Sequence, residues 1–200
     1  MKVTASPVSP TVRARPGPDR DPNRFLDEHR GYVDALGAAG VNVTTLVGLD
    51  EFPDAVFIED AALCLWPIAV QLRPGATSRA GEAAVLHPDL VDHFEHVLTV
   101  DDGHIDGGDI LVTDHEAIVG TSSRTDRAGI AALERLFWSH DHVVRAVHTP
   151  PEVLHLKTDC AVIDSDITYT TARLAASGCF DGYRVITAPR AKRQPPISFA

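Results

Sequence analysis

A strand–strand–helix–strand pattern that recurs along the chain is the feature that most limits how this sequence can fold. Polar stretches recur with it, because Asp60 to Asp109 and Asp106 to His155 both span about fifty residues. Equivalent positions in repeated units converge on a common axis, as they do in a propeller. We therefore expect these four residues and Glu59 to surround one central cavity.

The same pattern predicts an α/β protein of about three full ββαβ units preceded by a partial one. The expected elements, in chain order, are a helix from 21 to 40, strands over 41–47, 52–65 and 69–72, helical pieces over 79–86 and 88–96, strands over 97–100, 110–113 and 117–119, a helix after the loop 121–126 that ends at 138, strands over 143–147, 160–163 and 167–170, a helix over 173–176 and a strand over 183–186. Ser78 is the expected cap of the helix at 79, and His87-Pro88 is expected to interrupt that helix.

Three regions of the chain differ in composition. Residues 1–20 are rich in Pro, Arg and Ser and show little periodicity, so we expect a loosely structured leader. The repeated pattern occupies 21–189, which we expect to form one domain. Residues 190–200 turn abruptly basic and Pro-rich, which predicts an aberrant tail without regular structure.

The stretch from Phe52 to Cys64 is typical of a buried strand, yet it carries two adjacent carboxylates. Glu59 and Asp60 would point to opposite faces, because side chains alternate along a strand. At least one carboxylate would then point into an apolar region, where it needs a cationic partner or several hydrogen-bond donors. Two interpretations follow: a structural salt bridge to a nearby arginine, or a pocket for a cationic ligand with several donors.

Composition excludes several classes of partner. A formal net charge of -10 argues against nucleic acid, which requires basic patches. No apolar run approaches the roughly 20 residues that span a bilayer, and residues 1–20 lack the apolar stretch of a secretory signal, so none is expected. Cys64, Cys160 and Cys179 form no CxxC motif and cannot all pair with one another, which favours a reduced, cytoplasmic setting.

Five motifs appear in one order along 21–189, and together they resemble the dimethylarginine dimethylaminohydrolases (dimethylargininases). The motifs are Phe52–Asp60, Arg73–Arg79, Asp106–Asp109, Ser123–Asp126 and Leu154–Thr158. The resemblance implies the pseudo-fivefold α/β propeller of the guanidino-modifying enzymes. It also implies a small-molecule substrate, since the family hydrolyses asymmetric dimethylarginine and monomethylarginine to citrulline and a methylated amine. The family uses no metal and no organic cofactor.

The resemblance assigns catalytic roles to two residues. The family's nucleophile is a cysteine near the C-terminus, which attacks the guanidinium carbon to give a covalent thiouronium intermediate. His155 resembles the histidine that acts as general acid for the departing amine and then as base for water, which suits a group that titrates near neutrality. Asp106 resembles the carboxylate that orients this histidine. The alternatives are a core histidine and a turn residue before Gly107.

The resemblance also assigns five substrate-binding residues. Glu59 and Asp60 resemble the carboxylates around the substrate guanidinium, whose planar fork of donors carboxylates match. Asp54 resembles the contact to the amino-acid end of the substrate. Arg79 and Arg124 resemble the pair that holds the α-carboxylate, and the alternative for each is a solvated surface cation.

The sequence departs from the family at the nucleophile, which has no counterpart before Ala200. We do not expect Cys64, Cys160 or Cys179 to replace it, so the ring is expected to be incomplete and this chain inactive by itself. An arginine deiminase-type relative is less favoured, because that branch has Asp where Lys157 stands. A non-catalytic remnant of the family remains an open alternative.

The sequence also bears on a metal site and on self-association. Neither HExxH nor an EF-hand spacing is present, so no metal is expected. The residues that could suggest a metal site are Asp101, Asp102, His104, Asp106, Asp109, His93 and His96. An open propeller exposes sheet edges, which predicts self-association into a homo-oligomer.

Overall fold

The computed structural model describes residues 2–4, 21–138 and 142–189, and three successive units of one kind dominate it. The first unit contains β3 (Ala62–Leu65), β4 (Ile68–Gln71), α2 (Glu82–Val91) and β5 (His96–Thr99). The second contains β6 (Ile110–Val112), β7 (Ala117–Thr121), α3 (Arg127–Trp138) and β8 (Val144–His148). The third contains β9 (Cys160–Asp164), β10 (Ile167–Thr170), α4 (Ala172–Ala175) and β11 (Arg184–Thr187).

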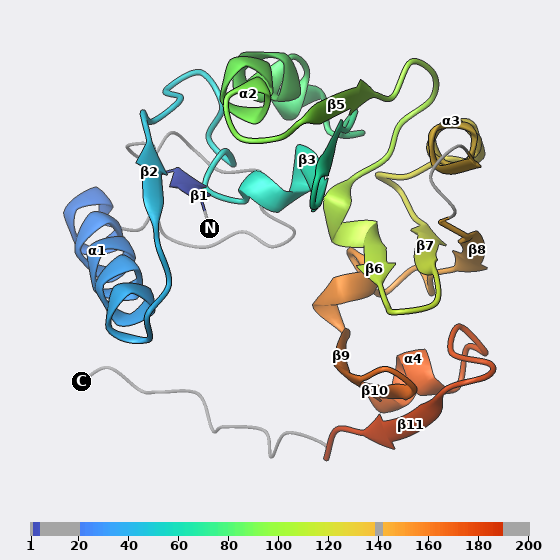
Figure 1. Ribbon diagram of the computed structural model, residues 1–200. Helices are drawn as coiled ribbons and strands as arrows, with labels where there is room; N and C mark the ends of the chain where they lie inside the picture. The colour runs from blue at the N-terminus through green and yellow to red at the C-terminus, as the bar shows by residue number, and fades with distance from the viewer. Residues whose placement is uncertain (1, 5–20, 139–141, 190–200) are drawn as a thin grey trace.

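Each unit builds one three-stranded sheet by the same route. The first two strands form an antiparallel hairpin, and the third strand returns through the helix to pair in parallel with the second. The helix is required by this order, because a parallel neighbour needs a crossover connection. The predicted α/β fold of repeated ββαβ units is thus confirmed. Figure 1 shows the units following one another around an arc that the described residues do not close into a ring.

A partial unit precedes these three. Helix α1 (Pro22–Ala38) begins as predicted, with the Asp21 side chain accepting a hydrogen bond from the Asn23 backbone and Pro at the first helical position. Strand β2 (Thr44–Leu46) pairs in parallel with β1 (Lys2–Thr4). Residues 5–20 of the predicted leader and the whole predicted tail, 190–200, lie outside the described residues.

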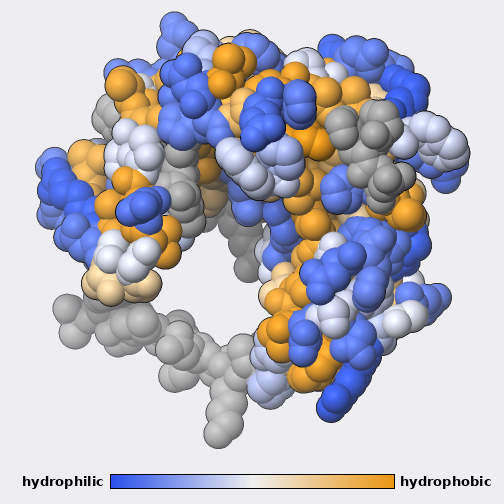
Figure 2. Space-filling model, in the orientation of Figure 1, coloured by the Kyte–Doolittle hydropathy of each residue, from blue (hydrophilic) through white to orange (hydrophobic). Residues whose placement is uncertain are grey.

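The sheet of the second unit connects two apolar clusters. Side chains alternate along its strands, so Ile110 and Val119 pack in one cluster with β4 and α3. Their neighbours Leu111 and Ile118 point the other way, into a cluster with Leu156 and the third unit. The units are therefore held to one another by a shared sheet rather than by separate cores. Figure 2 shows hydrophobic surface on the part of the third unit that borders the opening of the arc.

Two sequence-based predictions about local structure were wrong. The strand expected over 52–65 is confined to β3, and Ile58–Asp60 forms a 3-10 turn instead. The backbone amides of Ala55, Phe57 and Asp60 bond to carbonyls three residues earlier, which satisfies them without a strand partner. Phe57, expected in the core, is 57% exposed.

The second error concerns α2, which runs through Pro88 rather than breaking there. Its N-cap is Gly81, whose φ of 91° lies in the left-handed region that favours glycine. Ser78 lies in the preceding 3-10 turn, Thr77–Arg79. Over the part of the chain that the structure describes, no helix is long and apolar enough to cross a bilayer.

Candidate functional site

A cavity of about 290 Å³ lies where the three units meet, and all seven predicted site residues line it. They are Asp54, Glu59, Asp60, Arg79, Asp106, Arg124 and His155. The structure brings these residues together although they are up to about one hundred positions apart, whereas Asp109, which was also expected around the cavity, is not among its lining residues. Lys157 also lines the cavity and was assigned no role from the sequence.

The convergence follows from three short turns with one period. A 3-10 turn begins at Ile58, at Gly107 and at Leu156, 49 residues apart each time, and each leads into the first strand of a unit. The turns pack against one another at the axis, so the polar residues in and beside them face a common space. Two glycines permit this approach. A Cβ on Gly107 would lie 1.8 Å from the Glu59 carbonyl oxygen, and one on Gly108 would lie 2.9 Å from both Asp60 and His155.

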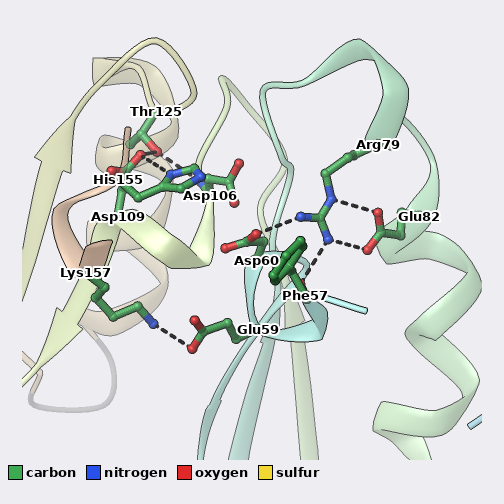
Figure 3. Close-up of polar contacts among 10 residues, drawn as sticks. All are labelled: Phe57, Glu59, Asp60, Arg79, Glu82, Asp106, Asp109, Thr125, His155 and Lys157. Atoms are coloured by element: carbon green, nitrogen blue, oxygen red, sulfur yellow. Dashed lines mark hydrogen bonds and ion pairs between the residues drawn. The ribbon is translucent and has the colours of Figure 1, made fainter. Parts of the chain in front are cut away.

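Arg79 is the centre of a buried ion-pair cluster, which Figure 3 shows on one side of the site. Its guanidinium donates to both carboxylate oxygens of Glu82, at 2.8 and 2.5 Å, and to Asp60 at 2.7 Å. It also donates to the Phe57 carbonyl oxygen at 3.0 Å. Four of its five N–H donors are thus engaged within the protein, and the residue is 3% exposed.

Asp106, on the other side of the site, lacks such partners. Its side chain is buried at 1% exposure, and neither carboxyl oxygen has a hydrogen-bond partner among the described residues. Burial, followed by the negative charge of Asp60, raises the pKa of Asp106 to about 7. Only the Asp106 backbone is fixed, by an amide that donates to the Thr125 hydroxyl at 3.0 Å. A buried carboxyl without a partner indicates that a ligand or a proton completes it.

His155 is held beside Asp109, a residue to which the sequence gave a place near the axis but no role. Asp109 is completely buried and accepts hydrogen bonds from the hydroxyls of Ser122 and Thr125 and from the Leu156 amide. Its carboxylate lies 3.6 Å from Nδ1 of His155, which is an ion-pair rather than a hydrogen-bond distance. Asp109 therefore fixes the loop that carries the imidazole.

The charges around His155 favour its protonated form. Burial lowers the pKa of His155, but Asp109, Asp106 and Asp60 oppose that effect, and the net result is a pKa above the ordinary value. The imidazole can therefore carry a proton near neutral pH, as a general acid requires.

Glu59 and Lys157 form an ion pair at 3.1 Å at the edge of the cavity. Glu59 is largely exposed, whereas its neighbour Asp60 is buried, so the two adjacent carboxylates do face different environments as predicted. The reason is the 3-10 turn rather than the alternation of a strand. The predicted buried salt bridge to an arginine is the contact between Asp60 and Arg79.

Arg124 differs from Arg79 in having no carboxylate partner among the described residues, although it lines the same cavity. Its loop is fixed by its own backbone amide, which donates to the Ser122 hydroxyl at 2.9 Å. Asp54 is half-buried at the cavity wall. The cavity thus offers one unpaired guanidinium and several carboxyl groups to a ligand.

None of the three cysteines lines this cavity. Burial raises the pKa of Cys160 to about 12, and its thiol donates to the Leu156 carbonyl oxygen. Cys179 is buried, with its thiol against the His148 carbonyl oxygen. Cys64 lies in a different, more apolar cavity of about 520 Å³. All three cysteines therefore lie outside the candidate site.

One group of side chains among the described residues is dense enough to hold a metal ion. Ligand atoms of Asp60, Asp106 and His155 lie within 4.8 Å of one another. Asp60 is already engaged by the Arg79 cation at 2.7 Å, which disfavours a second cation of higher charge at the same oxygen. We assign no metal to this group.

Comparison with known proteins identifies the family. A model of the family described as arginine deiminase matches residues 83–194, more than half of the chain. The chain belongs to the arginine deiminase family. An N(G),N(G)-dimethylarginine dimethylaminohydrolase of Pseudomonas aeruginosa is 29% identical to this chain over 173 residues. One of Streptomyces coelicolor is 37% identical over 134 residues.

Solved structures agree with this assignment. The Pseudomonas aeruginosa enzyme, as a cysteine-to-serine variant complexed with citrulline, superposes with a TM-score of 0.84 at 25% identity. That match covers 94% of this chain and 76% of the solved chain. An amidinotransferase from Microseira wollei, at 15% identity and a TM-score of 0.71, shows the same fold. The predicted membership of the dimethylargininases is thus confirmed, within the broader family that the arginine deiminase model describes.

The matches cover the relatives only in part. The aligned region spans 83% of this chain but 66% of the Pseudomonas protein, and 66% of this chain but 52% of the Streptomyces protein. The family and the fold are shared over that region, whereas the activity of the whole relatives is a matter of proposal for this chain.

Proposed function

We propose that the cavity binds an Nω-methylated arginine and serves hydrolysis of that ligand to citrulline and a methylated amine. The buried, unpartnered carboxyl of Asp106 beside Asp60 carries this proposal, because a guanidinium supplies the donors and the positive charge that both groups need. The dimethylargininase relatives support the identity of the ligand.

The ligand's two ends fit different parts of the cavity wall. The guanidinium lies against Asp60 and Asp106, with Glu59 at the rim. Arg124 has no carboxylate partner among the described residues, so it binds the α-carboxylate, and Asp54 accepts from the ammonium group. Arg79 has four of its five donors engaged within the protein, so it acts by holding Asp60 in position.

The chemistry assigned by the family needs a thiolate, a proton donor and water. The thiolate adds to the guanidinium carbon, and protonated His155 gives its proton to the departing methylated amine. Neutral His155 then takes a proton from water, whose oxygen attacks the thiouronium carbon, and the thiolate leaves as citrulline forms. The position of His155 in the cavity wall supports both transfers, whereas no lining residue of the cavity is a cysteine. The thiolate is therefore the part of the reaction that the described cavity does not supply.

Calorimetric titration with asymmetric dimethylarginine and with 1,1-dimethylguanidine tests the assignment of the two ends. Arg124→Met should weaken the amino acid about 10- to 100-fold, because it removes a charge-assisted contact. The same variant should leave dimethylguanidine, which has no carboxylate, within about twofold. Arg127→Met, at the exposed start of α3, is the matched control.

A parallel assay for citrulline separates turnover from binding. Citrulline formation that is lost in His155→Ala would support hydrolysis by this chain. Binding without citrulline would support the alternative of a non-catalytic methylarginine site. Absence of binding by either ligand would refute the proposed function.

A further inference from the structure

The Asp106 carboxyl is the most poorly satisfied polar group of the site, and its surroundings explain why. Its own element contributes Asp109, which is buried and occupied. The neighbouring turns contribute the carboxylate of Asp60, the guanidinium of Arg79 and the imidazole of His155. Two positive groups act on Asp106: the imidazole of His155, and Arg79, which is already paired with Asp60 and Glu82. Asp106 thus has a negative neighbour, and its carboxyl accepts no hydrogen bond from a described residue.

A carboxyl group in that position is stable in one of two states. Without a ligand it keeps its proton, because an ionised carboxylate that is buried next to another carboxylate is unfavourable. With a cation in the cavity it can ionise, because the cation supplies both charge and donors. The net charge of the site is then the same before and after the cation enters.

We propose that Asp106 exchanges its proton for the charge of the ligand: a guanidinium binds with release of the Asp106 proton, whereas a neutral urea binds with that proton retained. The inference rests on the proposed function and makes Asp106 the residue that distinguishes the cationic substrate from the neutral product. On guanidinium binding the O–H bond of Asp106 breaks and the proton passes to the solvent. On urea binding the intact O–H donates to the urea oxygen.

The exchange sets different pH dependences for the affinities of the two ligands. Burial and Asp60 raise the pKa of Asp106 to about 7, so the group is largely protonated at pH 6 and ionised at pH 9. Below pH 7 the affinity for a guanidinium should fall about tenfold per pH unit, because a proton must leave for each ligand bound. The affinity for a urea should not fall over that range. Acidic conditions therefore favour the product over the substrate.

Calorimetric titration at pH 6 in two buffers with different ionisation enthalpies counts the protons directly. Asymmetric dimethylarginine should release about 0.9 proton per ligand bound, and citrulline about none. At pH 9 the release with asymmetric dimethylarginine should fall to nearly zero, since Asp106 is then ionised before the ligand arrives. Equal proton release with both ligands, or none with asymmetric dimethylarginine at pH 6, would overturn the inference.

Variants identify the source of the proton. Asp106→Asn is isosteric and cannot ionise, so proton release should disappear, while His155→Gln should retain most of it. Asp101→Asn, at an exposed carboxylate paired with Arg135, is the control and should release as the unaltered chain does. Release that persists in Asp106→Asn and disappears in His155→Gln would assign the proton to the imidazole and contradict the proposal.

The same titration separates the two proposals. If both ligands bind without proton exchange, the inference is wrong and the proposed function stands. If neither ligand binds to a chain that melts cooperatively, both are wrong. Thermal unfolding of each variant, followed by circular dichroism, shows whether a lost signal reflects a lost fold.

Discussion

The two sides of the cavity treat buried charge in opposite ways. On one side, the carboxylates of Asp60 and Glu82 share the guanidinium of Arg79, and every strong contact is made within the protein. On the other, Asp106 is equally buried and its carboxyl has no partner among the described residues. The first arrangement gives rigidity, whereas the second leaves an interaction for the ligand to complete. Such incomplete groups are typical of sites that sacrifice stability for function.

Removal of the Arg79 cation, which pairs with Asp60 and Glu82, should have the largest effect on stability. Arg79→Met leaves the fully buried Glu82 and the buried Asp60 without a cation, which should lower the free energy of unfolding by about 3–5 kcal/mol. Urea denaturation at pH 7 measures this change. Arg135→Met removes an exposed pair with Asp101 and should cost less than about 1 kcal/mol. Similar losses in the two variants would contradict the contrast between buried and exposed pairs.

A smaller loss of stability should follow substitution of Asp109, which supports the loop of His155. Asp109→Asn places an amide NH₂ among donors from Ser122, Thr125 and Leu156, so the free energy of unfolding should fall by about 2–4 kcal/mol. The variant also removes a negative charge that raises the pKa of His155, so this pKa should fall. Titration of the imidazole by NMR measures the shift. An unchanged His155 pKa in a folded Asp109→Asn variant would show that Asp109 does not act on the imidazole.

The smallest effect should have the opposite sign. The pKa of Asp106 is raised to about 7 in the folded chain, so the folded state loses stability as pH rises from about 4 through 7. Asp106→Asn cannot ionise, so it removes that loss of stability. The difference in free energy of unfolding, variant minus unaltered chain, should therefore rise by about 1–3 kcal/mol from pH 4 to pH 8. Denaturation at both pH values measures the difference. A variant that is destabilised more at pH 8 than at pH 4 would mean that Asp106 is a satisfied carboxylate in the folded chain.

The sequence predicted the larger features of the fold because these depend on periodic signals. The repeat of about fifty residues predicts the ββαβ units and the convergence of Asp60, Asp106 and His155, whose side chains do lie close together. Local structure around Phe57 was harder to predict. The segment has the apolar composition of a strand, but it forms a series of turns whose backbone amides donate to carbonyls three residues earlier.

The partners of the charged residues were harder still to predict. Arg79 and Arg124 each follow a serine in the sequence, yet Arg79 is enclosed by Glu82 and Asp60 while Arg124 faces the cavity. That difference depends on how the turns of separate units pack, which no single motif encodes. The lack of a partner for Asp106 is likewise a property of the assembled units.

The most direct test of this account is a crystal structure of the chain with asymmetric dimethylarginine. The account predicts the ligand's guanidinium within hydrogen-bond distance of both Asp106 and Asp60, with the Arg79 contacts to Glu82 unchanged. A ligand held elsewhere, with the Asp106 carboxyl still unpartnered, would contradict it.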